Sequence, residues 1–356
     1  MTDAGRPRIL LLAMYPLDRG LWGATTRITQ LRDELARLAR LDVVSGTRAE
    51  RAAALARYVA GRRLHRLNGI YVEASTVLPG PADLAFLALA RARRVPVLTY
   101  IRDAQQLFAE YYPADSVRRR LSRAAFRPTM RGLMAVSSHV AFPSRGLARA
   151  VLGDDGRADR ATLLPPGARL GRRMPIDPAA SGFLFVGSLR YPAHGGDLLL
   201  EALGGARAAG VEPELIWVAP PDEPPRADLP GWVRLERAQG EAIDRLLPAV
   251  LASVTPRRRT PYNDLAVPIK VLEYLGFGRP LLVTDTVETR AIVEAAGCGL
   301  VVPDRAAALR DGVVELMRAP FERIATWGAA ARAHAEANSW SHRARRVMEL
   351  LAEDRR

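Results

Sequence analysis

The amino-acid sequence predicts an α/β protein of two consecutive doubly wound domains, each with a parallel sheet between helices. Apolar runs of four to six residues alternate with helical patterns along the whole chain, which is typical of strand–helix units. The 356 residues exceed one ordinary core and suit two domains of about 150–180 residues. A polar segment rich in glycine, proline and arginine, residues 168–181, breaks the alternation and is expected to link the domains.

Short apolar runs predict five strands in the first domain, residues 1–167. They span residues 9–14, 41–44, 70–73, 95–100 and 140–142. Between the first two, a helix that begins near Ala24 carries a buried stripe of apolar side chains at three- and four-residue spacing. Its members are Ile28, Leu31, Leu35 and Leu38.

A second series of strands follows in residues 182–339. It spans residues 183–186, 214–218, 232–235, 281–284 and 299–302. Helical patterns over residues 306–317 and 323–353 complete the chain. The sequence has no internal repeat that would indicate a solenoid or a propeller.

Composition excludes several classes of protein. With 49% hydrophobic and 25% charged residues, the chain is expected to be globular and not disordered. No run reaches the roughly 18–20 apolar residues that cross a bilayer. Cys298 is the only cysteine, which excludes an intrachain disulfide and a cysteine-based metal site. We therefore expect a cytoplasmic protein.

The net charge of +14 is unevenly placed. Residues 1–170 contain 28 Arg and 14 Asp plus Glu, whereas residues 171–356 contain equal numbers of basic and acidic residues. One surface of the first domain is therefore expected to face an anionic partner. Among 52 basic residues only Lys270 is a lysine, which makes that position notable.

Two common phosphate motifs are absent from the sequence. It contains no Gly-x-Gly-x-x-Gly, and Lys270 is not part of a Gly-Lys-Ser/Thr loop, so most NAD enzymes and P-loop NTPases are excluded. Two glycine-bearing strand-to-helix turns remain, one at Gly23 and one from Gly187 to Arg190. Such turns let a phosphate approach the backbone at a helix N-terminus, although each could be a plain tight turn.

The most informative stretch surrounds Lys270. Pro268 predicts a helix start, and Glu273 lies three residues after Lys270 on the same helical face. A lysine near a helix N-terminus suits a diphosphate, and a carboxylate one turn later suits ribose hydroxyls. A solvated ion pair between Lys270 and Glu273 is the alternative. Arginine would form such a pair equally well, so the use of the one lysine at this position favours a specific role.

This stretch resembles GT-B fold, family-4-like (group 1) glycosyltransferases, in particular a subgroup with a Pro-x-Lys-x-x-Glu-Tyr-Leu run. Weaker similarities cover nearly the whole chain, including Phe142-Pro-Ser144, Leu164-Pro-Pro-Gly167 and Phe185-Val-Gly187. The resemblance implies two Rossmann-like domains that face each other across a cleft. It also implies that a last helix, at about residues 340–356, packs back on the first domain.

The resemblance further implies a metal-independent transferase of hexosyltransferase type. Its donor would be a nucleoside-diphosphate sugar, with UDP or GDP, and no other cofactor. The domain at 182–339 would bind this donor, with Glu273 on the ribose and Lys270 and the Gly187 loop at the diphosphate. Residues 1–167, with Gly23, would present the acceptor.

Some residues depart from the family pattern. The family's first glutamate, eight positions before Glu273, is Leu265 here. The usual basic pair after the first strand of the second domain is replaced by Ser188 and His194, so Arg190 is expected to contact the diphosphate. These changes leave retention or inversion of the sugar's configuration open.

Arg102 and Asp103 follow the fourth strand, where the family often has a histidine, and are the expected catalytic pair. In an inverting enzyme, Asp103 could deprotonate the acceptor hydroxyl. Otherwise it would orient Arg102 or cap the next helix. Glu73, at the end of the third strand, is a weaker candidate base. No metal site is expected, because the sequence lacks an Asp-x-Asp pair and suitably spaced histidines.

A basic helix is predicted over residues 116–131. Val117, Leu121 and Ala124 form one stripe, and arginines from Arg118 to Arg131 occupy the rest of the helix. A solvated helix is one interpretation; the other is peripheral binding to the anionic inner face of a membrane. The acceptor would then be lipid-linked, although polysaccharide and natural-product intermediates are also open. Nucleic acid is not expected, because the aromatic residues form no stacking series.

Two other functions remain open at this point. A sugar-nucleotide epimerase could use the same fold, but it would need cleft carboxylates and a histidine that the sequence does not place together. A degenerate transferase that serves as a scaffold is the second alternative. The absent first glutamate favours a scaffold, whereas Lys270 and Glu273 count against it.

Overall fold

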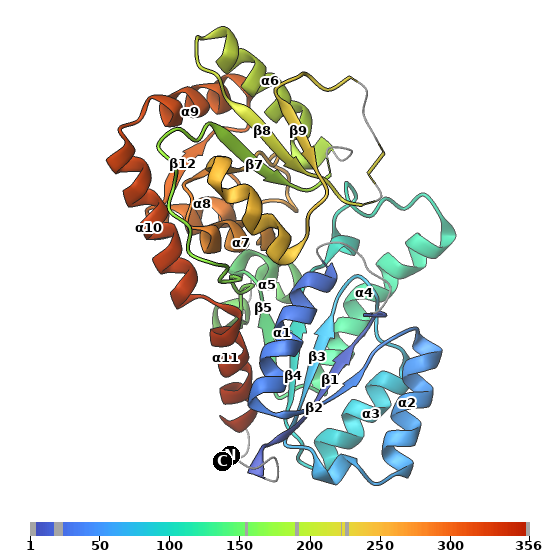
Figure 1. Cartoon of the computed structure of the whole chain (residues 1–356). Coiled ribbons are helices and arrows are strands. Elements are labelled where there is room, and N and C mark those ends of the chain that lie inside the picture. The colour runs from blue at the N-terminus through green and yellow to red at the C-terminus, as the bar shows by residue number, and fades with distance from the viewer. Residues whose placement is uncertain are drawn as a thin grey trace. The chain divides into compact units, whose positions relative to one another are not determined.

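The computed structural model describes residues 5–17, 24–153, 156–188, 192–221, 223–224 and 228–353 (Figure 1). The chain divides into two compact units, Met1–Pro166 with Trp340–Arg356 and Gly167–Ser339. The segment expected as a linker is part of the second unit. There Arg279 donates hydrogen bonds to the backbone carbonyls of Met174 (3.0 Å) and Pro175 (3.1 Å), which anchors the segment.

In its described residues, the first unit holds a six-stranded parallel sheet with the order β2-β1-β3-β4-β5-β6. The strands are β1 (Arg8–Ala13), β2 (Arg40–Val44), β3 (Gly69–Ala74), β4 (Val97–Ile101), β5 (His139–Phe142) and β6 (Thr162–Leu163). The helices are α1 (Ala24–Leu38), α2 (Arg48–Ala60), α3 (Pro81–Ala92), α4 (Val117–Ala135), α5 (Arg145–Leu152) and α11 (Trp340–Glu353), with short 3-10 turns at Leu64–Arg66, Gln105–Leu107 and Ala158–Arg160.

The described part of the second unit also forms a six-stranded parallel sheet, with the order β12-β11-β10-β7-β8-β9. Its strands are β7 (Gly182–Val186), β8 (Glu214–Val218), β9 (Val233–Glu236), β10 (Val250–Thr255), β11 (Leu281–Thr284) and β12 (Gly299–Val302). Its helices are α6 (Gly196–Ala208), α7 (Ile269–Phe277), α8 (Val287–Ala296), α9 (Ala306–Arg318) and α10 (Phe321–Ala337), with 3-10 segments at Pro192–His194 and Gly240–Ala249.

The α/β fold class is confirmed, but three elements differ from the sequence expectation. Strands β6 and β10 were not predicted. In β10 the apolar run is interrupted by Ser253 and follows the 3-10 segment Gly240–Ala249 directly, so in the sequence it resembles the end of the preceding helical pattern. The terminal pattern at 323–353 is two helices, not one. It breaks at Asn338, whose side chain donates a hydrogen bond to the carbonyl of His334 (3.0 Å).

Alternate side chains of β1 bury themselves on opposite faces of the first sheet. Leu10 and Leu12 belong to the core under α2, α3 and α4, whereas Ile9 and Leu11 pack with α1 and α11. Helices α1 and α11 lie side by side on this second face (Figure 1). Burying each large aliphatic side chain contributes about 1.5–3 kcal/mol, so both faces stabilise the unit. None of the described helices is long and apolar enough to span a membrane.

Strand order locates the functional edge of each sheet. In the first sheet the chain leaves β1 for β2 on one side and returns to β3 on the other. In the second sheet, β7 leads to β8 on one side, whereas β10 lies on the other side of β7. Ligands of open α/β sheets bind beyond the carboxyl ends of strands at such reversal points. The loops after β1 and β3, and after β7 and β10, are therefore the candidate binding regions.

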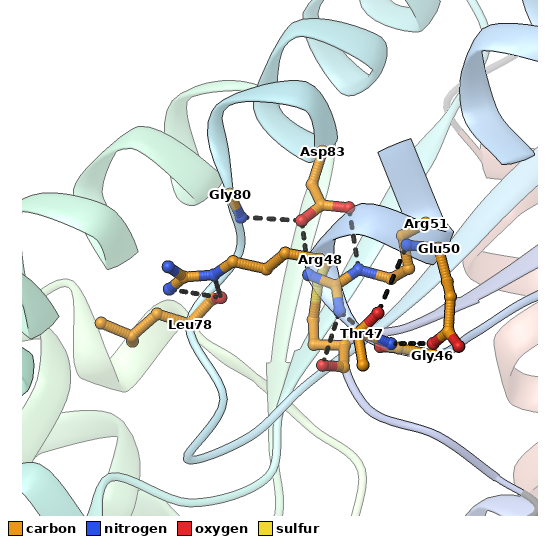
Figure 2. Close-up of polar contacts among 9 residues, drawn as sticks. Gly46, Thr47, Arg48, Glu50, Arg51, Leu78, Gly80 and Asp83 are labelled. Atoms are coloured by element: carbon orange, nitrogen blue, oxygen red, sulfur yellow. Dashed lines mark hydrogen bonds and ion pairs between the residues drawn. The ribbon is translucent and has the colours of Figure 1, made fainter. Parts of the chain in front are cut away.

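A buried ion pair fixes loops at the carboxyl edge of the first sheet (Figure 2). The Arg51 guanidinium donates to both carboxylate oxygens of Asp83, at 2.9 and 2.6 Å. It also donates to the carbonyls of Met14 (2.9 Å) and Gly46 (2.8 Å), which follow β1 and β2. Asp83 in turn accepts a hydrogen bond from the backbone N–H of Gly80 at the start of α3 (2.7 Å). One arginine thus holds three segments of this edge together.

Candidate functional site

The turn after β7 requires glycine at position 187. Gly187 has φ +143°, and a Cβ atom on it would lie 3.0 Å from Nζ of Lys270. Its carbonyl accepts a hydrogen bond from Nε1 of Trp217 (2.7 Å), and its N–H donates to the carbonyl of Val218 (3.0 Å). The structure therefore brings two sequence-predicted residues, Gly187 and Lys270, into direct proximity on a fixed turn.

Lys270 lies in the first turn of α7, which begins after Pro268. Its Nζ is 4.6 Å from the ring centroid of Phe185 and makes no ion pair with any described carboxylate. Burial and, to a smaller extent, the positive charge of Arg257 lower the pKa of Lys270 to about 7, while the charge of Glu273 acts in the opposite direction. An ammonium in this setting is poorly compensated, so an anionic ligand would stabilise it.

Glu273 lies one turn after Lys270 and is half-buried. Burial raises its pKa to about 7, while the positive charges of Arg169 and Lys270 act in the opposite direction. Arg169 is itself paired with Asp244, at 2.5 and 3.2 Å. Glu273 makes no ion pair within the described residues, so its carboxylate is available to hydroxyl donors.

Sequence reasoning missed Arg257, which follows β10 and is 8% exposed. The loops after β7 and β10 converge there, because the N–H of Arg258 donates to the carbonyl of Ala193 (3.2 Å). The charge of Arg257 acts on both Lys270 and His194. Gly195, at φ +74°, permits this approach, because a Cβ there would lie 1.5 Å from the carbonyl oxygen of Pro256. Recognising β10 as a strand would have placed Arg257 and the two arginines after it at the strand's carboxyl end, but not shown which of the three is buried.

In the first unit, polar side chains gather at the carboxyl ends of β1, β3 and β4. Arg102 donates to one carboxylate oxygen of Asp103 from Nε (3.1 Å) and Nη2 (3.0 Å), and to the hydroxyl of Tyr15 (3.2 Å). Thr76 donates to the other oxygen of Asp103 (3.0 Å). The predicted pair is therefore adjacent, with both oxygens of Asp103 already engaged. This geometry suits a carboxylate that orients Arg102.

Glu73 occupies a different environment. Its side chain is fully buried and accepts hydrogen bonds from Arg27 (2.5 Å) and from the hydroxyl of Tyr71 (2.7 Å). The Arg27 guanidinium also lies over the ring of Tyr100, 3.6 Å from the centroid. A general base must reach the substrate's proton, and this enclosure argues against that role for Glu73.

Two of the expected site residues, Gly23 and Arg190, lie outside the described residues. Within the described part of the chain, no group of three or more His, Cys, Asp or Glu residues could hold a metal ion. The polar groups at the two candidate regions thus differ in charge. The second unit collects cations beside a glycine turn, and the first holds an arginine–aspartate pair.

Comparison with known proteins gives a family match and a common fold. Residues 180–319 match the family model described as Glycosyl transferases group 1, a range that includes Gly187, Arg257, Lys270 and Glu273. Sucrose-phosphate synthase from Thermosynechococcus elongatus superposes with a TM-score of 0.66 at 16% identity, over 98% of this chain and 99% of that one. The fold is GT-B. A search of curated protein sequences finds no match.

Two further GT-B structures are similar over almost their full length. Anabaena HepE, in complex with UDP-glucose, has a TM-score of 0.65 at 14% identity, over 97% of this chain and 99% of that chain. WaaG, a glycosyltransferase involved in lipopolysaccharide biosynthesis, has a TM-score of 0.64 at 14% identity, over 96% and 99%. The resemblance to GT-B, family-4-like glycosyltransferases stated from sequence is therefore confirmed, by the fold of the whole chain and by the family match of its second unit.

Proposed function

We propose that the protein is a glycosyltransferase of hexosyltransferase type that uses a nucleoside-diphosphate sugar. The observation that carries the proposal is Lys270, which lacks an ion pair among the described residues beside the Gly187 turn, at the reversal point of the second sheet. In this assignment Lys270 binds the diphosphate, and Glu273, one turn further along, accepts hydrogen bonds from the ribose. UDP is the first nucleotide to test, because the HepE structure contains UDP-glucose.

The proposed chemistry is charge stabilisation by the protein. As the bond between the sugar's anomeric carbon and the diphosphate breaks, negative charge grows on the leaving oxygen, and Lys270 stabilises it. The oxygen of the acceptor hydroxyl forms the new bond to the anomeric carbon, and its proton passes to the departing diphosphate. No metal ion is required in this proposal, because the chain supplies the positive charge.

The first unit would bind the acceptor, with Arg102 as the catalytic residue that contacts it. Since Thr76 and Arg102 engage both oxygens of Asp103, we assign Asp103 the role of holding the Arg102 guanidinium. Asp103→Asn should then reduce turnover with little effect on donor affinity. If Asp103 is instead the base, the same variant should abolish turnover and remove a limb of the pH–rate profile.

Nucleotide binding and donor turnover test the proposed function. The purified protein is titrated calorimetrically with UDP, GDP, ADP and dTDP, and then incubated with the sugar form of the nucleotide that binds. Tight binding of one diphosphate, together with its release from the sugar nucleotide, supports a transferase. If a nucleotide binds, but incubation changes the configuration of the sugar in the sugar nucleotide, the protein is an epimerase. If no nucleotide binds, a scaffold role replaces the proposal.

The affinity for the sugar nucleotide should pass through a maximum near pH 7. The diphosphate favours protonated Lys270, so affinity falls as pH rises above about 7, by at most about tenfold per pH unit. Glu273 must be ionised to accept from the ribose, so affinity also falls below about 7. Calorimetry with UDP-glucose from pH 5.5 to 9 measures both limbs, because its diphosphate has no ionisation in this range.

Two variants separate the limbs of this profile. Lys270→Arg keeps its charge at every pH and should remove the alkaline limb. Glu273→Gln should remove the acidic limb and weaken binding at its optimum. An alkaline limb that persists in Lys270→Arg would assign that titration to another group.

Helix α4 supports a second part of the proposal, docking on an anionic membrane. Phe126, Met130 and Leu133 face the core, whereas Val117 and Leu121 are 71% and 65% exposed. Four exposed arginines lie on the same helix: Arg118, Arg120, Arg127 and Arg131. Apolar side chains flanked by arginines suit the interface of an anionic bilayer better than open water.

Replacing Arg118, Arg120 and Arg127 together with glutamine should weaken binding to vesicles containing anionic lipid by about 100-fold. Each basic residue near such a surface contributes about 1 kcal/mol, and 1.4 kcal/mol is a factor of ten. Co-sedimentation measures the change. The matched control replaces Arg290, Arg318 and Arg323, three exposed arginines of the second unit. If both triple variants lose the same affinity for the vesicles, binding depends on the net charge of the protein and not on helix α4.

A further inference from the structure

Three consecutive arginines follow β10, and their surroundings differ. Arg258 pairs with Asp197 (2.8 Å) and Arg259 with Asp264 (2.9 Å), and both arginine side chains are well exposed. Arg257 is 8% exposed and makes no ion pair with any described carboxylate. The buried arginine is therefore the one whose charge the described chain leaves uncompensated.

Arg257 is held in place by an amide. Its Nη2 donates to Oδ1 of Asn263, and Nδ2 of Asn263 donates to the carbonyls of Arg258 (2.7 Å) and Ala193 (3.1 Å). Nε of Arg257 is buried without a hydrogen-bond partner. A buried guanidinium with an unused donor costs free energy unless a ligand or another group accepts from it.

The other groups nearby do not neutralise this charge. Asn263, which holds Arg257, donates to the carbonyl of Ala193 beside His194, and Nζ of Lys270 lies at the Gly187 turn on the same loop. The positive charge of Arg257 accordingly lowers the pKa values of both Lys270 and His194. Burial and the two cations lower the pKa of His194 to about 3, so it is neutral there at physiological pH. The region between the loops after β7 and β10 therefore holds two cationic side chains, Arg257 and Lys270, neither paired with a described carboxylate.

We propose that Arg257 is the second cation of the diphosphate site, acting with Lys270 in the role that the sequence assigned to Arg190. The planar fork of a guanidinium can bind two phosphate oxygens at once, and its position after β10 is at the sheet's reversal point. The inference rests on the proposed donor site and names a residue of it. Asn263 acts as its positioning residue, because it holds Nη2 of Arg257.

Arg257→Met gives the decisive comparison. Replacing a buried, uncompensated cation with an apolar side chain of similar size removes the free-energy cost of burying that charge. The ligand-free variant should therefore melt no lower than the wild type. Its affinity for the nucleoside diphosphate that the wild type binds should fall about 10- to 100-fold, as expected for a lost charge-assisted contact. The affinity for the matching nucleoside, which has no phosphates, should stay within about twofold.

Arg258→Met is the matched control, because it removes an adjacent arginine that is already paired, and it should leave diphosphate affinity unchanged. Arg257→Lys should recover part of the affinity through its charge. Unchanged diphosphate affinity in Arg257→Met, an equal loss for diphosphate and nucleoside, or a failure to fold would each overturn the inference. Failure of the proposed function is distinct, because the wild type itself would then bind no nucleoside diphosphate.

Discussion

Lys270→Met is expected to lower the affinity for the donor's nucleoside diphosphate by about 100-fold and the rate of sugar transfer by about 10²–10³-fold. The expected loss in rate exceeds the loss in affinity, because the charge on the leaving diphosphate grows as the bond to the sugar breaks. Folding should be little affected, since Lys270 is half-buried and makes no ion pair with a described carboxylate. Calorimetry and release of the diphosphate from the sugar nucleotide measure the two effects.

Glu273→Gln is the companion variant, one helical turn away. It keeps the shape of the side chain but weakens its acceptor, so affinity should fall about tenfold and the transfer rate in proportion. Lys270→Arg should retain most of the rate, provided that the larger side chain fits beside Gly187. A Lys270→Met protein that binds and turns over its donor as the wild type does would remove Lys270 from the site.

The sequence predicted those parts of the fold that have a regular apolar period. The helix with Ile28, Leu31 and Leu35 on one face was found this way, as were most of the strands. Strand β10 was missed because Ser253 interrupts its apolar run and a 3-10 segment with helical spacing precedes it. Because β10 was not predicted, the position of Arg257 after the carboxyl end of a central strand was not predicted either.

Spacing along one helix can be read from sequence, but contacts between loops cannot. Lys270 and Glu273 were paired from their spacing of three residues, and Lys270 stood out in the sequence as one lysine beside 51 arginines. Nothing in the amino-acid sequence distinguishes Arg257 from Arg258 or Arg259. Only the fold reveals which of the three is buried, since burial depends on a turn at Gly195 some 60 residues earlier.

Arg51→Met should lower the free energy of unfolding of the first unit by about 3–5 kcal/mol, a large part of the 5–15 kcal/mol typical of a folded domain. The variant leaves the carboxylate of Asp83 buried without a cation (Figure 2). It also removes the donors to the carbonyls of Met14 and Gly46. At about 2–4 °C per kcal/mol for a domain of this size, the melting temperature should fall by about 10 °C, which calorimetry detects.

Arg48→Met is the matched control, because Arg48 lies on the same helix but is exposed, and among the described residues it donates to the carbonyl of Leu78 alone (3.2 and 3.3 Å). It should cost less than about 1 kcal/mol. The double variant Arg51→Met/Asp83→Leu removes both charges, so it should recover much of the loss if the damage in Arg51→Met comes from an unpaired carboxylate. If the double variant is as unstable as Arg51→Met, the hydrogen bonds to Met14 and Gly46 matter more than the ion pair. Equal stability of Arg51→Met and Arg48→Met would contradict both explanations, because it would mean that neither contact holds the loops beyond β1 and β2 in place.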